Sequence, residues 1–224
     1  MPVPPRRSDS RTPTKQRVSL TKQHIIEVAA ELVREGGSVA FRVADLSERA
    51  SVGIPTIYYH FTSREQVIAE AQLANYFTMT MELPTHFNRA SEAIVSRQEP
   101  VFHEALRDNL ATAWRLGGFD AQVGIMRMLI DIWAVPQTRR EFLDMLDGQY
   151  ARWVAVMTDA QELGWIDSAT DAGMLVSFFW AASIGQAAIP NRTGLDVTPE
   201  TIADFCLRVL GASSDGAARP RLAD

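Results

Sequence analysis

The sequence predicts an all-α fold, and three observations support this prediction. Apolar residues recur at i, i+3, i+4 and i+7, first from Ile25 to Val33 and again from Phe142 to Ala160, as in helices that bury one face. No run of alternating apolar and polar residues is long enough to require a β-strand. Glycines and proline-containing caps stand where the periodic segments end or begin. We therefore expect helices along the whole folded part of the chain.

Three short helices are predicted near the N-terminus. The first spans about Thr21 to Glu35, the second about Val43 to Ala50, and the third Ile54 to His60, after the turn Ser51-Val52-Gly53. Two short helices joined by a three- or four-residue turn that contains glycine form a helix-turn-helix, whose second helix enters the major groove of DNA. The apolar residues of this region can form one small core, which comprises Ile25, Ala29, Leu32, Val43, Leu46, Ala50, Val52, Ile57 and Phe61. The outward side of the third helix is then polar and aromatic.

Helix ends are also marked in the rest of the chain. Gly117-Gly118 closes one segment, and Leu163-Gly164-Trp165 places glycine at the C′ position of a Schellman-type end. Thr198-Pro199-Glu200 supplies a cap, a proline at N1 and an early acid for a last helix that Gly211 closes. The segment from Ala172 to Gly185 carries no charge, and at 1.5 Å per residue it is about 21 Å long, too short for a bilayer core of about 30 Å. Its own domain or a partner chain must cover it, and we expect no membrane association.

The net charge of −5 hides an asymmetry along the chain. Residues 1–22 carry six basic side chains and one acidic one, which is +5, whereas residues 71–224 carry twelve basic and nineteen acidic side chains, which is −7. One end can approach a polyanion while the rest is repelled by it. Prolines and serines predict a disordered basic arm at residues 1–17, and residues 212–224 read as a disordered tail. The arm is either an idle solvated tail or a segment that meets phosphates.

Residues 37–70, GSVAFRVADLSERASVGIPTIYYHFTSREQVIAE, resemble the DNA-binding domain of the TetR family of bacterial transcriptional regulators. The resemblance rests on the aliphatic pair Val43 and Leu46, the turn from Ala50 to Val52, and the motifs Tyr58-x-His60-Phe61 and Ser63-Arg64-Glu65. It implies a helix-turn-helix DNA-binding domain at residues 18–70, followed by a larger helical ligand-binding and dimerisation domain at residues 71–211.

The resemblance also implies which residues meet DNA. The expected DNA-binding residues are Lys22, Arg42, Ile54, Pro55, Thr56, Tyr58, Tyr59, His60 and Arg64. Ile54 and Thr56 point to base edges, since a threonine methyl suits a thymine methyl, and the others reach phosphates or sugars. Tyr58 is alternatively a core residue, and Arg42 alternatively lies over the domain surface. Ser51, Gly53 and Pro55 depart from the usual turn residues of the family, and we expect them to alter the DNA sequence read while leaving the fold intact.

The larger domain is rich in methionine and tryptophan, which predicts either an ordinary core or a cavity for an apolar or aromatic ligand. The expected ligand-binding residues are Phe102, His103, Arg107, Trp114, Arg127, Trp133, Trp153 and Met157. By resemblance the last two helices form the dimer interface, with Phe178, Ile184, Phe205 and Val209 in it. A twofold dimer presents two recognition helices about 34–36 Å apart and reads a near-palindromic operator.

These observations predict a cytoplasmic, ligand-responsive transcriptional regulator. We expect a homodimeric repressor that binds double-stranded DNA and is released by an apolar or aromatic small-molecule effector. An enzyme is not expected, because the sequence has no H-E-x-x-H motif, no glycine-rich phosphate loop and no nucleophile elbow. No cofactor or metal is expected either, because Cys206 is the single cysteine and the pair Glu99 and His103 lacks a third ligand. The alternatives are a helical small-molecule-binding protein with a vestigial helix-turn-helix, or a transcriptional activator.

Overall fold

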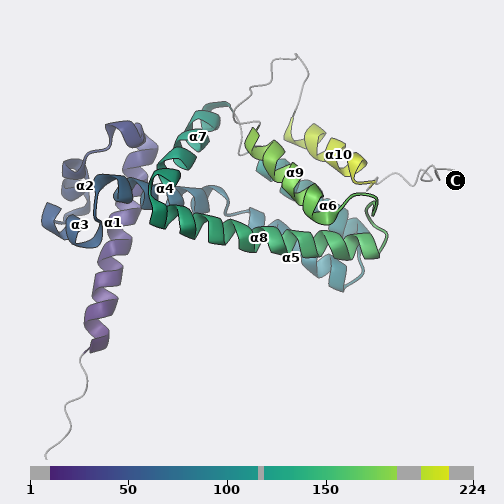
Figure 1. Ribbon diagram of the computed structural model, residues 1–224, viewed down its shortest axis with the longest axis horizontal. Helices are drawn as coiled ribbons and strands as arrows, with labels where there is room; N and C mark the ends of the chain where they lie inside the picture. The colour runs from purple at the N-terminus through teal and green to yellow at the C-terminus, as the bar shows by residue number, and fades with distance from the viewer. Residues whose placement is uncertain (1–10, 116–118, 186–197, 212–224) are drawn as a thin grey trace, which may run out of the picture.

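The computed structural model describes residues 11–115, 119–185 and 198–211, which form ten helices and no strand (Figure 1). The predicted all-α fold is confirmed. In chain order the helices are α1 Arg11–Ala40, α2 Val43–Ala50, α3 Ile54–His60, α4 Arg64–Met79, α5 Leu83–Val95, α6 Glu99–Arg115, α7 Phe119–Ala134, α8 Pro136–Glu162, α9 Ala172–Gly185 and α10 Pro199–Val209.

The molecule is elongated, with α1, α2 and α3 at one end and α5, α6, α9 and α10 at the other (Figure 1). The N-terminal end has its own core, in which Ile25, Leu46, Ile57 and Phe61 are almost completely buried. The larger part has a second core around residues such as Phe102, built from α5, α6, α8, α9 and α10. Each end therefore has a hydrophobic core of its own.

Helix α4 belongs to both parts. Val67 and Ile68 pack in the N-terminal core, whereas Leu73, Tyr76 and Met79 pack with residues of α7 and α8. The expected boundary between residues 70 and 71 thus lies inside a continuous helix and not in a linker. A displacement of α4 must act on both cores.

Helix α1 begins at Arg11, ahead of the predicted start at Thr21, so residues 11–17 are helical where we expected a disordered arm. Pro13 lies in the first turn, where its missing N–H has no helical partner to lose, so it does not stop the helix. The helix is interrupted at Gly37, which has φ 74° and lies two residues after the predicted helix end at Glu35. Residues 1–10, the tail 212–224 and the predicted stop at Gly117-Gly118 lie outside the described residues.

Other helix ends follow the sequence signals. Gly164 has φ 73°, and the amide of Trp165 donates to the carbonyl of Ala160 at 2.9 Å, which completes the predicted Schellman end of α8. The hydroxyl of Thr198 accepts from the amide of Thr201 at 3.2 Å and caps α10. Within the described ranges, no helix has the length and the apolar character that a membrane span requires.

Candidate DNA-binding and effector sites

The turn between α2 and α3 is held by its own backbone. The amide of Val52 donates to the carbonyl of Ser47, and the amide of Ser51 donates to that of Glu48, which is the Schellman pattern. The hydroxyl of Ser47 also donates to the carbonyl of Val52 at 2.7 Å. Ser51 takes the left-handed conformation, with φ 54°, at a cost on the order of 1 kcal/mol relative to glycine. The unusual serine is therefore accommodated, and the angle between α2 and α3 is fixed.

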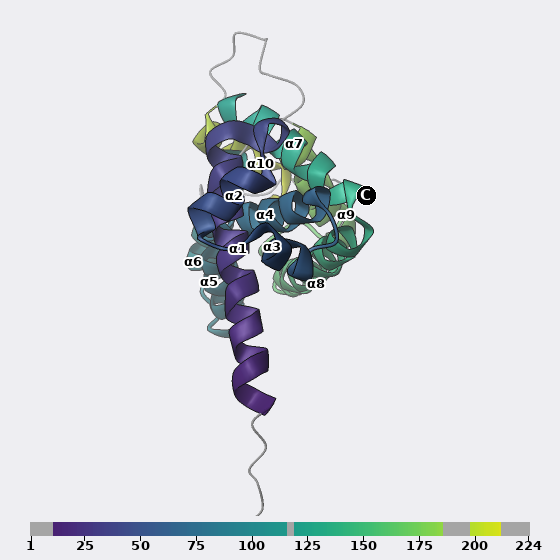
Figure 2. The same cartoon turned by 90° about the vertical axis from the view of Figure 1, so that its left-hand side faces the viewer.

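Helix α3 buries a single side chain, Ile57, and turns the rest of its surface outward. Ile54 and Thr56 are exposed at its N-terminal end, Tyr58 is half exposed, and Tyr59 is 74% exposed. Figure 2 looks onto this end of the molecule, and none of the described helices of the larger part covers α3 there. Tyr58 is thus not a core residue, and α3 presents a polar and aromatic face to solvent.

Arg42 precedes α2 and is exposed. Within the described ranges, no acidic side chain pairs with it. By contrast, Arg49 donates to Glu35 at 2.7 Å and binds α2 to α1. That hydrogen bond lowers the pKa of Glu35 below its ordinary value. Arg42 is therefore a cation that remains available to an outside partner.

A cavity of about 630 Å³ lies in the larger part and is lined by residues from α4 to α10. Its wall is mainly apolar, and its aromatic residues are Tyr76, Phe87, Trp114, Trp133, Phe142, Trp153, Phe179 and Trp180. Burial raises the pKa of Tyr76, and it raises the pKa of Cys206, also in the wall, to about 11. Both groups stay protonated at neutral pH. Pockets of this size and character bind small molecules.

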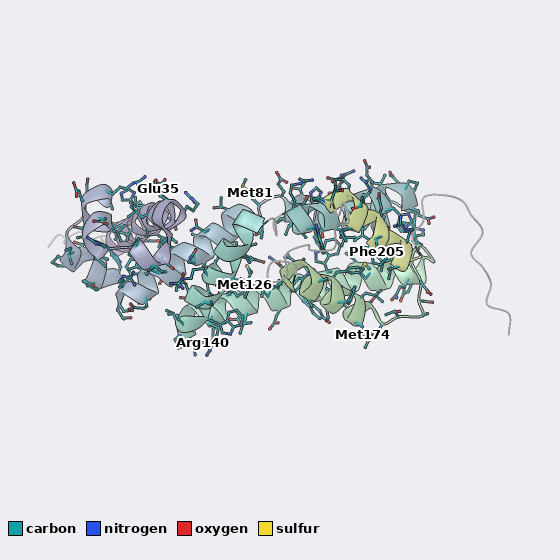
Figure 3. All side chains as sticks on the ribbon, turned by 90° about the horizontal axis from the view of Figure 1, so that it is seen from above. Glu35, Met81, Met126, Arg140, Met174 and Phe205 are labelled. Atoms are coloured by element: carbon teal, nitrogen blue, oxygen red, sulfur yellow. The ribbon has the colours of Figure 1, made fainter. Side chains whose placement is uncertain are left out.

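Helices α9 and α10 carry apolar side chains that the chain itself leaves uncovered. Helix α9 packs on α8, and Phe178 and Ile184 remain 60% and 47% exposed. Helix α10 packs on α6, and Phe205 and Val209 are each 53% exposed. Met174 of α9 and Phe205 of α10 are labelled in Figure 3, in the part of the molecule away from α1, α2 and α3. Exposed apolar surface of this kind is typical of a protein interface.

Residues 25–71 match a known family, the bacterial regulatory proteins of the tetR family. These residues carry the DNA-binding domain of that family. The match begins in α1 and ends in α4, so it covers the helix-turn-helix and the core beneath it. The resemblance seen in the sequence is confirmed. No curated protein matches this sequence.

Solved structures share the fold of this chain over most of its length. A Mesorhizobium loti protein assigned to the TetR family is 18% identical, with 88% of this chain and 97% of that chain covered and a TM-score of 0.62. A Saccharomonospora viridis protein described as a transcriptional regulator, in complex with choline, is 18% identical over 86% and 96%, with a TM-score of 0.56. The regulator FadR from Bacillus subtilis, in complex with stearoyl-CoA, is 15% identical over 85% and 98%, with a TM-score of 0.54.

Two of the expected DNA contacts are engaged inside the N-terminal domain. Lys22 pairs with Glu70 at 2.7 Å, and its Nζ lies 5.3 Å from the ring centroid of Phe61. Arg64 donates from Nη2 to the carbonyl of Ser38 at 2.8 Å and from Nε to the carbonyl of Phe41 at 3.0 Å. An arginine fork is suited to the free carbonyls at a helix C-terminus. Both cations therefore hold α1 and α4 together, and their contact with DNA stays a prediction.

The cavity wall includes four of the expected ligand residues and excludes the other four. Those in the wall are Trp114, Trp133, Trp153 and Met157. Phe102 is fully buried in the core against Trp165, and the Nε2 of His103 lies 3.1 Å from the carbonyl of Trp165. Both side chains thus contact Trp165 and lie outside the cavity wall.

The two expected ligand arginines are engaged elsewhere. Arg107 donates to Asp204 at 2.7 Å, which joins α6 to α10 and lowers the pKa of Asp204. Arg127 donates to the hydroxyl of Ser38 at 3.0 Å and lies 3.8 Å from Asp131. Sequence reasoning also missed Arg152, which lines the cavity. Arg152 directly precedes Trp153 on α8, and its position next to this expected ligand residue was the one sequence signal that could have indicated it.

The new role of Arg64 predicts that Arg64→Met lowers stability. Its loss leaves the carbonyls of Ser38 and Phe41 without their donor, at a cost of about 1–3 kcal/mol. The free energy of unfolding, measured by urea denaturation, should fall by this amount. Arg42→Met is the control and should leave stability unchanged. If Arg64→Met keeps full stability and instead shows a reduced salt dependence of DNA binding, Arg64 is a phosphate contact.

Proposed function

We propose that this TetR-family regulator is a repressor that binds a near-palindromic operator as a homodimer and is released when a small apolar molecule enters the cavity. The observation that carries the proposal is the position of α7. Its residues Met128 and Trp133 line the cavity, while Arg127, on the same helix, is hydrogen-bonded to Ser38 beside the helix-turn-helix. A ligand that displaces α7 therefore acts on the part of the chain that carries α3.

DNA recognition is proposed for the outward face of α3. Ile54, Pro55 and Thr56 are exposed at its start and are suited to contact base edges in the major groove. Phosphate contacts are assigned to Tyr58, Tyr59, His60 and Arg42, of which the first two and Arg42 are exposed. Phosphate contacts set the register of the helix on DNA, and base contacts set the sequence.

Release by a ligand requires that the ligand binds two states of the protein with different affinity. Helix α7 packs on α1 and α4, and Gln72 of α4 donates to Asp131 of α7 at 3.0 Å. Helix α7, which supplies part of the cavity wall, is thus hydrogen-bonded to Ser38 in the DNA-binding domain and to Gln72 of α4. FadR from Bacillus subtilis binds stearoyl-CoA and the Saccharomonospora viridis regulator binds choline, which supports a small-molecule site in this fold.

The double substitution Thr56→Ala with Tyr59→Ala tests the recognition helix. It should weaken operator binding at least tenfold, because each lost base or phosphate contact costs about 1–3 kcal/mol. Fluorescence anisotropy with DNA selected from a random pool measures this, and tryptophan fluorescence measures ligand affinity, which should not change. Thr158→Ala, at an exposed site on α8, is the matched control. Unchanged operator binding in the double variant would reject α3 as the recognition helix. If the wild-type protein shows no selective DNA binding, the alternative of a small-molecule-binding protein is favoured.

The dimer is proposed on the apolar faces of α9 and α10. Phe178→Glu and Phe205→Glu should each convert a dimer into a monomer, because a charge placed in an apolar interface remains unpaired there. Sedimentation at micromolar concentration measures the change, and circular dichroism checks that helicity is retained. Val95→Glu is the control, since Val95 is 83% exposed and lies on α5, outside the two helices of the proposed interface. A monomeric wild-type protein, or dimers in both variants, would contradict the proposed interface.

A further inference from the structure

We propose that the effector is an amphipathic anion, with an apolar body inside the cavity and a carboxylate held by Arg152 at the solvent-facing edge. This inference rests on the proposed function, because it assigns a chemical class to the effector of the same cavity. Three observations carry it: the charge of the cavity wall, the surroundings of Arg152, and the size of the cavity.

Arg152 is the single charged side chain among the described residues that line the cavity. The wall contains no aspartate, glutamate or lysine within those ranges, and its ionisable Tyr76 and Cys206 are protonated at neutral pH. The wall therefore has a charge of +1 and no anion to balance it. An anionic ligand is attracted by this charge, and a cationic ligand is repelled.

The guanidinium of Arg152 is not used to hold the fold together. Four other arginines of the larger domain each pair with an acid, namely Arg89, Arg107, Arg115 and Arg127. For Arg152, by contrast, no acidic partner exists among the described side chains, those of residues 19–115, 124–185 and 198–211. Its Cζ lies 5.4 Å from the ring centroid of Phe87, which also lines the cavity. Stacking on this ring aligns the planar guanidinium of Arg152 with the cavity wall. Its N–H groups are then available to donate hydrogen bonds to a carboxylate.

Neutral polar side chains stand beside this cation. Gln149 lies three residues before Arg152 on α8, one helical turn away, and it also lines the cavity. Asn88 follows Phe87 on α5 and lines the same cavity. Amide N–H groups next to a guanidinium can donate the remaining hydrogen bonds that a bound carboxylate accepts. Arg152 is also exposed to solvent, which places the head group at the edge and the apolar body inside.

The cavity volume sets the size of the apolar body. At about 30 Å³ for each water-sized group, a cavity of 630 Å³ accommodates roughly 20 non-hydrogen atoms. A chain of twelve to sixteen carbons, or a fused-ring system of similar size, fits this volume. A small cation such as choline does not fill it, although the aromatic wall could hold a quaternary ammonium by cation–π contacts. Charge and size together therefore favour the anion.

Three ligands with the same chain test the head group: dodecanoate, dodecanol and dodecyltrimethylammonium. Tryptophan fluorescence reports binding, because Trp114, Trp133, Trp153 and Trp180 line the cavity. The wild-type homodimer should bind dodecanoate at least tenfold more tightly than either of the other two. Arg152→Met should reduce this preference to less than about threefold and leave dodecanol affinity unchanged. The matched control Arg140→Met, which removes an exposed arginine from the same helix, should keep the full preference.

A preference for dodecyltrimethylammonium or dodecanol, or a preference for dodecanoate that survives in Arg152→Met, would overturn the assignment of an anionic effector. The proposed function would still stand if the preferred ligand released operator DNA. Dodecanoate binding that depends on Arg152 but leaves operator affinity unchanged would instead support the anion site and contradict the ligand-released repressor. If none of the three ligands binds, both proposals fail.

Discussion

Two arginines from different helices converge on Ser38, the buried residue that follows the break in α1 at Gly37. Arg64, at the start of α4, binds its carbonyl at 2.8 Å, and Arg127 of α7 binds its hydroxyl at 3.0 Å. The carbonyl and the hydroxyl belong to one residue, so α4 and α7 cannot move independently of the end of α1. The rest of the proposed mechanism depends on this junction, because it joins the helix-turn-helix to a wall of the cavity.

Features set by neighbouring residues could be predicted from the sequence. The bounds of α2 and α3 agree with the prediction, because their turn and their apolar positions are all local signals. The segment from Ala172 to Gly185, noted in the sequence for its lack of charge, coincides with α9. The start of α1 was not predicted, because Pro13 was read as part of a disordered arm although a proline in a first helical turn costs no hydrogen bond.

Features set by distant partners could not be predicted. Arg107 and its partner Asp204 are 97 residues apart in the chain, and Arg127 and Ser38 are 89 residues apart. Both arginines therefore read as ligand contacts, although the structure uses them to hold helices together. Trp114, Trp133, Trp153 and Met157 were assigned to the cavity by their size and apolar character, and they do line it. Arg152 was missed because its place in the cavity wall and over the ring of Phe87 depends on packing between α8 and α5, which lie far apart in the sequence.

The central claim is that ligand binding in the cavity reaches α3 through the contact of α7 with Ser38. The most direct test is operator affinity measured with and without saturating dodecanoate, in the wild-type protein and in Arg127→Met. Allosteric coupling typically changes affinity about 5- to 150-fold. We predict that dodecanoate weakens operator binding at least tenfold in the wild type and less than threefold in Arg127→Met. The affinity for dodecanoate should be equal in both proteins. Equal weakening of operator binding in the two proteins would contradict it.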